Sequence, residues 1–222
     1  MSEIIIFGSG ETAILAYEYF THDSEYTVRA FSVDKEFITE TTLCELPIVD
    51  TETALTDFPP SEFKAFVAAS AGKLNRIRKD LYNRVAGFGY DLVSYVSSRA
   101  FVWPNVKIGE NCFILEDNTL QPFTEVGNNV VLWSGNHLGH RSVVEDHCFI
   151  TSHCVISGFC RIGHSSFLGV NCTLEDEVRI SDECFVGAGA IIRKNTQARE
   201  FYQESQTDLA KIDTYRLFRI KE

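Results

Sequence analysis

The chain has 222 residues, of which 45% are hydrophobic and 23% charged, a balance typical of one or two soluble globular domains. Thirty-one acidic residues outnumber 20 basic ones, giving a net charge of −11 with histidine neutral, which disfavours a nucleic-acid partner. No apolar run reaches about 18 residues, so we expect no membrane span. The first residues also lack the basic and long apolar segments of a signal peptide.

Residues 1–92 predict a small α/β domain. A buried strand at 4–7 precedes a glycine-rich turn, and a helix runs from Glu11 to Phe20. A second strand at 26–33, a short third at 47–49 and a fourth at 65–69 follow, and a last helix spans roughly 73–85. Strands that alternate with helices indicate a parallel sheet. We expect a Rossmann-like domain of about half the usual size.

The glycine-rich turn of this domain is typical of a phosphate-binding loop. Gly8, Ser9 and Gly10 open a helix directly after a strand, where helix N–H groups can meet a pyrophosphate. Asp34 ends the second strand, where its carboxylate can accept hydrogen bonds from a ribose or a base. The short domain fits a mononucleotide or nucleotide sugar better than NAD. The alternative is a turn that only packs the helix on its sheet.

Residues 93–196 follow a six-residue repeat. Every sixth residue from Val96 to Val186 is Val, Ile or Leu, and the residue four places after each is small or short. Such hexads predict a parallel β-helix, in which three hexads, each with one short strand and one turn, close an 18-residue coil. Coils stack at the strand spacing of about 4.8 Å. The aliphatic residues would fill the interior.

Six of the seven cysteines occupy the small inward position of the hexad (Cys112, Cys148, Cys154, Cys160, Cys172, Cys184). Free cysteine is a small side chain that is readily buried. The sequence has no CxxC pair, which would indicate a zinc or redox site. We therefore expect reduced core thiols in a cytoplasmic protein. Asn118 and Asn136, 18 residues apart in the same inward column, predict a buried amide ladder.

Five of the six histidines lie close together in the repeat (His137, His140, His147, His153, His164). Their places on the coils do not bring three of them together, so we predict no metal site. A zinc site shared between subunits, as in γ-carbonic anhydrases, is the alternative. His140 is the candidate general base, because Gly158, 18 residues on, leaves its imidazole accessible to the proton it would remove.

The chain resembles the bacterial nucleotide-sugar acyltransferases, which join a small α/β domain to a left-handed β-helix. These include bacillosamine- and perosamine-type N-acetyltransferases and sialic-acid O-acetyltransferases of the NeuD type. The resemblance rests on the loop at Gly8, on Asp34, on residues 75–78 and on the hexads around His140. It alone implies the left hand, a homotrimer, and acetyl-CoA bound between adjacent β-helices, with no metal.

The resemblance also assigns roles to residues of this chain. It implies that His140 is the catalytic base and that the nucleotide sugar contacts Gly8, Ser9, Gly10, Asp34, Asn75 and Arg78. Acetyl-CoA would be bound by Gly158, Gly169, Val170, Gly187 and Ala188. An oxyanion or acyl pocket is expected at Gly158, Asn136 and His137, with a backbone N–H near Gly158 as oxyanion donor.

Three features depart from the family pattern. An acidic residue usually follows the catalytic histidine, whereas Arg141 follows here, and Phe149 replaces a histidine that contacts the acetyl group. The tail at 197–222 lacks the usual Gly-x-Pro-Ala ending. Its Leu209, Ile212 and Leu217 predict a helix or strand that caps the open end of the solenoid.

These features predict a cytoplasmic, acetyl-CoA-dependent N-acetyltransferase for a nucleotide-linked amino sugar, in bacterial surface-polysaccharide or glycan biosynthesis. His140 would take a proton from the sugar amine as the amine attacks the thioester, without a covalent acyl-enzyme. Two alternatives stay open. One is O-acylation of a sugar hydroxyl, and the other is a non-catalytic scaffold that binds sugar nucleotides.

Overall fold

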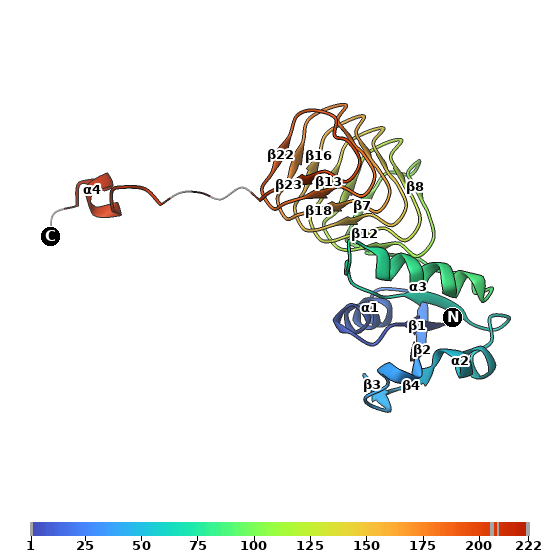
Figure 1. Cartoon of the computed structure of the whole chain (residues 1–222). Coiled ribbons are helices and arrows are strands. Elements are labelled where there is room, and N and C mark those ends of the chain that lie inside the picture. The colour runs from blue at the N-terminus through green and yellow to red at the C-terminus, as the bar shows by residue number, and fades with distance from the viewer. Residues whose placement is uncertain (1, 205–206, 208, 221–222) are drawn as a thin grey trace.

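The computed structural model describes residues 2–204, 207 and 209–220 and shows an α/β part followed by a stack of triangular coils (Figure 1). The α/β part is built on a sheet of order β3-β4-β2-β1-β5, in which β3 alone of its described strands is antiparallel to its neighbour. Its strands are β1 (Ser2–Phe7), β2 (Tyr26–Val33), β3 (Thr42–Leu43), β4 (Leu46–Asp50) and β5 (Lys64–Val67). The parallel α/β arrangement predicted from the sequence is confirmed.

Helices α1 (Glu11–His22), α2 (Thr51–Asp57) and α3 (Arg76–Gly87) and the 3₁₀ turn η1 (Lys35–Phe37) join these strands. The sequence missed α2, because seven residues are too few to show a helical period. Helix α3 begins later than predicted. Lys73, Leu74 and Asn75 have φ of 51°, 54° and 64°, a left-handed turn that a right-handed helix cannot include.

From Tyr95 onwards the chain forms a β-helix of two-residue strands arranged as three faces. Face 1 contains β6 (Tyr95–Val96), β9 (Phe113–Ile114), β12 (Val131–Leu132), β15 (Phe149–Ile150), β18 (Phe167–Leu168), β21 (Phe185–Val186) and β23 (Phe201–Tyr202). Face 2 contains β7 (Phe101–Val102), β10 (Thr119–Leu120), β13 (His137–Leu138), β16 (Val155–Ile156), β19 (Thr173–Leu174) and β22 (Ile191–Ile192). Face 3 contains β8 (Lys107–Ile108), β11 (Glu125–Val126), β14 (Val143–Val144), β17 (Arg161–Ile162) and β20 (Arg179–Ile180).

The predicted hexad register is confirmed. Each strand pairs in parallel with the strand 18 residues on, as Leu138 does with Ile156. The second residue of each strand points inward, and from Ile114 onwards these aliphatic side chains are buried in one core. The six repeat cysteines are buried and free in the same core, as expected.

The predicted amide ladder is wrong, although both asparagines are buried. The Asn118 Nδ2 group donates to the backbone oxygens of Leu115 at 2.8 Å and Trp133 at 2.9 Å. Asn136 Oδ1 accepts the Cys154 N–H at 2.8 Å. Each amide therefore satisfies backbone groups of the turns, which lie nearer than the next side chain of the column.

The α/β part packs on face 1. Phe20 of α1 and Phe66 of β5 share a core cluster with Tyr95, Phe113 and Phe149, whose side chains point outward from face 1. Phe149, at the position where the family has a histidine, is thus buried in an interface between two parts of one chain. Helix α3 lies along the same junction (Figure 1).

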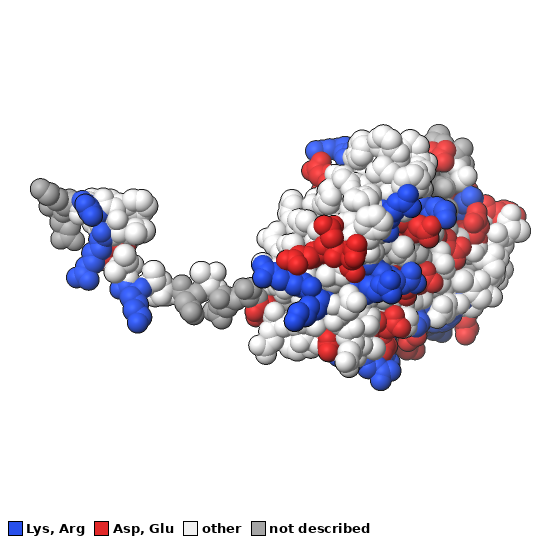
Figure 2. Space-filling view, turned by 90° about the horizontal axis from the view of Figure 1, so that it is seen from above, with Lys and Arg blue, Asp and Glu red and all other residues white. Residues whose placement is uncertain are grey.

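The expected cap formed by the tail is wrong for its described residues. β23 pairs with β21, so residues up to Tyr202 complete the last turn of face 1. Helix α4 (Thr214–Phe218) then stands away from the coils (Figure 1), and Leu209, Ile212 and Leu217 are exposed. Basic side chains gather on this tail in Figure 2. Residues 205, 206, 208, 221 and 222 of the predicted cap lie outside the described residues.

Candidate functional site

His140 lies at the corner between faces 2 and 3, and its side chain is exposed. Its backbone N–H donates to Gln121 Oε1 at 2.9 Å, and its ring meets the Phe159 ring edge-on with centroids 4.9 Å apart. A Cβ on Gly158 would lie 2.7 Å from His140 Cε1. The glycine therefore leaves room for the imidazole, as the sequence predicted. Among the described residues, no carboxylate is paired with this ring.

Two of the three residues predicted for the oxyanion or acyl pocket are engaged elsewhere. The Gly158 N–H donates to Asp176 Oδ1 at 2.7 Å, so it is not available to an oxyanion. Asn136 is buried, with both amide atoms bonded to backbone groups. Their predicted roles are wrong, because carboxylates and amides of neighbouring coils already satisfy these groups. His137 is half-buried on the outer side of face 2 and remains accessible.

The residues predicted to bind acetyl-CoA fall at two separate corners. Gly169 and Val170 stack below Gly187 and Ala188 in consecutive coils, at the corner between faces 1 and 2. Val170 and Ala188 are exposed there, which leaves this corner open to a ligand. Gly158 instead lies beside His140 at the corner between faces 2 and 3. Within one chain, face 2 separates the predicted base from the predicted acetyl-CoA contacts.

Face 2 is lined by exposed apolar side chains. They project from its strands and from the neighbouring corner, and we call them the apolar face: Phe101, Trp103, Phe123, Val155, Phe159 and Ile191. Ile191 is 60% exposed. Contiguous apolar surface of this kind marks an interaction site on a soluble protein. His140 lies at its edge, in contact with Phe159.

A pocket of 340 Å³ at one end of the α/β sheet contains two of the predicted nucleotide contacts, Gly8 and Asp34. Arg84 binds the Asp34 carboxylate through both terminal nitrogens, each at 2.8 Å, and this hydrogen-bonded pair lowers the pKa of Asp34. Phe37 and Ile77, 63% and 48% exposed, form apolar walls. Sequence reasoning missed Arg84, because it comes from α3, fifty residues after its partner.

The two glycines of the loop differ in kind. Gly8 has φ of 133°, and a Cβ there would collide with the Ala68 carbonyl oxygen, so the fold itself requires glycine. Gly10 has an ordinary φ of −86°, and a Cβ there would meet no protein atom within 4 Å. Half-buried Ser9 lies between them. Space rather than backbone geometry is what Gly10 provides at the start of α1.

The predicted nucleotide contacts of Asn75 and Arg78 are wrong. Both side chains are buried, at 0% and 1% exposure, in the junction between α3 and the coils. Asn75 Nδ2 donates to the Ser165 and Ser166 carbonyl oxygens, and Arg78 donates to oxygens of Asn129, His147 and Cys148. They join the two parts of the chain and do not line the nucleotide pocket.

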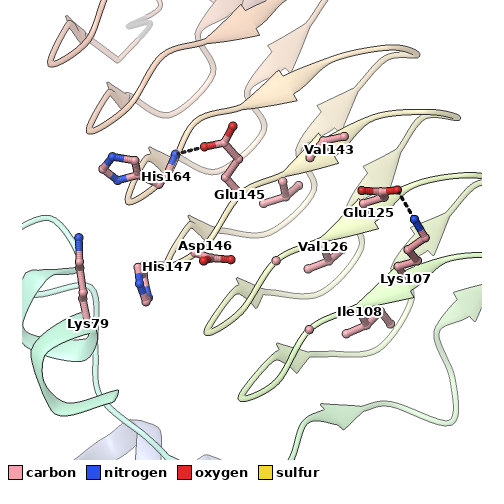
Figure 3. A pocket seen from close by; sticks show the side chains of 13 residues that line it. Lys79, Lys107, Ile108, Glu125, Val126, Val143, Glu145, Asp146, His147 and His164 are labelled. Carbon is pink, nitrogen blue, oxygen red and sulfur yellow. Dashed lines mark hydrogen bonds and ion pairs between the residues drawn. The ribbon is translucent and has the colours of Figure 1, made fainter. Parts of the chain in front are cut away.

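A larger pocket of 670 Å³ lies between α3 and face 3 (Figure 3). Lys79, His147 and His164 lie along one side of it, and Lys107 pairs with Glu125 at 2.7 Å on the other. His164 Nε2 lies 3.2 Å from Asp182 Oδ2, so this histidine has the carboxylate partner that His140 lacks. The pocket is at the corner between faces 3 and 1, away from His140.

His147 is buried at this corner, and burial lowers its pKa to about 4. Its Nδ1 lies 3.0 Å from Asn129 Nδ2, whose amide orientation is set by the bond from Arg78 to Oδ1. The imidazole is therefore neutral and carries its proton on Nε2. In the described part of the chain, no group of three or more His, Cys, Asp or Glu side chains is placed to hold a metal. None of the described helices is long and apolar enough to span a membrane.

A scan of the chain against protein-family models found no match. Solved structures with the same two-part architecture do match most of its length. The acetyltransferase domain of PglB from Neisseria gonorrhoeae is 20% identical with a TM-score of 0.76, covering 89% of this chain and 94% of that one. WeeI from Acinetobacter baumannii is 18% identical with a TM-score of 0.66, covering 89% and 94%.

A histidine-to-asparagine variant of perosamine N-acetyltransferase from Caulobacter crescentus, solved with CoA and GDP-perosamine, is 22% identical. Its TM-score is 0.77, and the match covers 92% of each chain. At these identities the likeness establishes the fold. The chain has a small α/β part followed by the left-handed parallel β-helix of hexapeptide-repeat proteins.

Proposed function

We propose that the protein is an acetyl-CoA-dependent N-acetyltransferase that acts on a nucleotide-linked amino sugar. The observation that carries this proposal is the shared two-part fold. Over 92% of its length this chain matches an N-acetyltransferase whose structure holds both CoA and a nucleotide-linked amino sugar. The accessible imidazole of His140, with Gly158 leaving space beside it, supplies the group that such chemistry needs.

The nucleotide end of the substrate would occupy the pocket between Asp34 and Phe37. Its apolar walls suit a base, and its polar end carries the Asp34–Arg84 pair. The phosphates would lie against the loop at Gly10, where the first N–H groups of α1 are free of intrahelical partners. The open space at Gly10 supports close approach of phosphate to the backbone.

His140 would act as a general base. The lone pair of the neutral sugar amine attacks the thioester carbonyl, the His140 imidazole takes the proton that the nitrogen sheds, and the C–S bond breaks to release CoA. A covalent acyl-cysteine does not fit. The repeat cysteines point into the core, where burial raises the pKa of Cys112 to about 11 and that of Cys148 to about 12.

The site would be completed between copies of the chain. His140 and the open corner at Val170 and Ala188 lie on opposite sides of the apolar face, so a neighbouring copy packed on that face can bring the two together. We propose a homotrimer, with acetyl-CoA between adjacent β-helices. Free cysteines and these activated substrates fit the cytoplasm.

The binding part of this proposal can be tested by a thermal-shift panel of UDP-, dTDP- and GDP-linked amino sugars and CoA, because a ligand stabilises the state that it binds. We expect one nucleotide series and CoA each to raise the Tm of the wild type. Gly10→Val and Asp34→Ala should abolish the nucleotide shift and keep the CoA shift. Loss of the CoA shift in these variants, or no nucleotide shift in the wild type, would contradict the assignment.

A further inference from the structure

One column of turn residues holds the α/β part on the coils. These residues occupy the same position in four consecutive coils, at the corner between faces 3 and 1, and we call them the seam: Asn111, Asn129, His147 and Ser165. Their φ values are 53°, 53°, 64° and 58°, and their exposures are 2%, 0%, 8% and 2%. Turn residues that normally face solvent are thus buried under one neighbour.

The first contact of the seam is with the edge of the α/β sheet. Asn111 Oδ1 accepts the Val67 N–H at 2.7 Å, and Asn111 Nδ2 donates to the Val67 oxygen at 3.2 Å. One side chain therefore pairs with the backbone of β5 as a further strand would. Asn111 Nδ2 also donates to Asn129 Oδ1 at 2.9 Å, which links the first two coils of the seam.

The second contact is with the start of α3. Arg78 donates to Asn129 Oδ1 at 2.9 Å, to the His147 oxygen at 2.9 Å and to the Cys148 oxygen at 3.1 Å, and it also bonds the Asn129 carbonyl. Asn75 Nδ2 donates to the Ser165 oxygen at 3.1 Å. The two side chains thus bond three successive coils, and the left-handed turn ending at Asn75 brings it to the seam.

The Arg78 charge is buried without a counter-ion among the described residues, and burial lowers its pKa to about 10. Neutral oxygens replace water only in part, and well-packed apolar residues often serve stability as well as a buried charge does. Directional bonds, however, fix position in a way that apolar contact does not. Because coils repeat along the solenoid, such bonds define which coil the α/β part grips.

Helix α3 connects this grip to the nucleotide pocket. Asn75 and Arg78 face the seam, whereas Ile77, Asp80, Leu81 and Arg84 of the same helix line the pocket. Lys79, the residue after Arg78, faces the larger pocket beside His147 (Figure 3). A shift of α3 along the seam would therefore move the bound nucleotide relative to every coil, including the one that carries His140.

We propose that Asn75 and Arg78 are positioning residues for acetyl transfer: their bonds to the seam set where the sugar amine lies relative to the catalytic corner. This inference rests on the proposed function. Its expected size follows from the geometric demand of transfer reactions, in which a misplacement of about 1 Å reduces the rate on the order of 100-fold.

The test compares Asn75→Ala and Arg78→Lys with Arg76→Gln. Arg76 lies in the same turn, but its 2.7 Å pair with Glu183 is exposed, so its loss should change little. We expect Asn75→Ala to keep the Kd for the nucleotide sugar within about twofold while kcat falls about 10- to 100-fold. Acetyl transfer from acetyl-CoA to free hydroxylamine, which does not use the nucleotide pocket, should keep the wild-type rate. Arg78→Lys, which retains the charge, should show the same split.

Equal kcat values for Asn75→Ala and Arg76→Gln would overturn the positioning role. So would a proportional loss of hydroxylamine-dependent turnover, because that result would show general damage to the coils. If the wild type transfers acetyl to hydroxylamine but to no nucleotide-linked amino sugar, the proposed substrate is wrong and the positioning role falls with it. Wild-type transfer to the sugar together with unaffected variants contradicts the positioning role alone.

Discussion

The coils and the α/β part differ in how far each residue's environment depends on its neighbours in sequence. In the coils, position in the hexad decides whether a side chain points inward, so Leu138 and Cys172 are buried as predicted. In the α/β part, local pattern located strands but not partners: Asp34 meets Arg84, fifty residues away. Periodic structure makes contacts local in register, whereas a compact α/β unit makes them through distant elements.

The candidate site shows the same difference. The room at His140 follows from the 18-residue column that contains Gly158, and the structure confirms it. The engagement of the Gly158 N–H follows from the same column, because Asp176 stands one coil further on. Comparable bonds join the Asn128 N–H to Asp146 and the His164 N–H to Asp182. A short acid at this position, 18 residues on, was therefore the signal for an occupied N–H.

The junction between the two parts could not be predicted from either pattern alone. Asn75 and Arg78 follow a strand at the place where family resemblance implied a ligand contact, and polar residues there suit either role. Their burial depends on a column of turn residues from Asn111 to Ser165, far along the chain. Hexad position marks these residues as turns but not as turns covered by another element.

The largest expected effect concerns the histidine of the coils. His140→Asn keeps a polar side chain but removes the basic nitrogen, so we expect the acetyl-transfer rate to fall at least about 100-fold. The matched control is His164→Asn at a different corner, where the imidazole has the Asp182 carboxylate. Its rate should stay within about threefold of the wild type. A larger loss in the control than in His140→Asn, measured as CoA release, would move the base to the face 3 pocket.

Gly158→Ala sharpens the claim that column position controls the site. The added Cβ would lie 2.7 Å from His140 Cε1, and the exposed ring can swing away, so the fold should tolerate the change. We expect turnover to fall about 10- to 100-fold, because the base is displaced. Gly87→Ala, where a Cβ meets no protein atom within 4 Å, is the control. Unchanged turnover in Gly158→Ala would separate His140 from the chemistry.

Replacements of a repeat cysteine test the packing of the coils. Cys172 is buried in a small inward site, so Cys172→Leu should overpack it and lower the free energy of unfolding by about 1–3 kcal/mol, whereas Cys172→Ala should lower it less. Denaturant unfolding measures both. Native thiol titration should modify half-buried Cys44 before the six buried thiols. Rapid modification of four or more thiols would show that the register is shifted.

The smallest expected effect is a pH dependence that arises at the seam. Burial lowers the pKa of His147 from 6.5 to about 4, so the unfolded chain binds its proton at higher pH than the folded chain does. The contribution of neutral His147 to stability is therefore complete above pH 6.5 and is lost as the pH falls toward 4. We expect Tm to fall across this window and His147→Gln to flatten the fall. Identical profiles for both proteins would show that His147 is already solvated.

The central claim is the transfer of acetyl from CoA to the amine of a nucleotide-linked sugar, and product analysis tests it most directly. Wild-type protein is incubated with acetyl-CoA and the amino sugar of the nucleotide series that raised its Tm, and the product is weighed before and after treatment with hydroxylamine. We predict one added acetyl group per released CoA, which survives hydroxylamine because it is an amide. An acetyl group removed by hydroxylamine would instead show O-acylation, and no CoA release with any of the three nucleotide series would contradict the enzyme assignment.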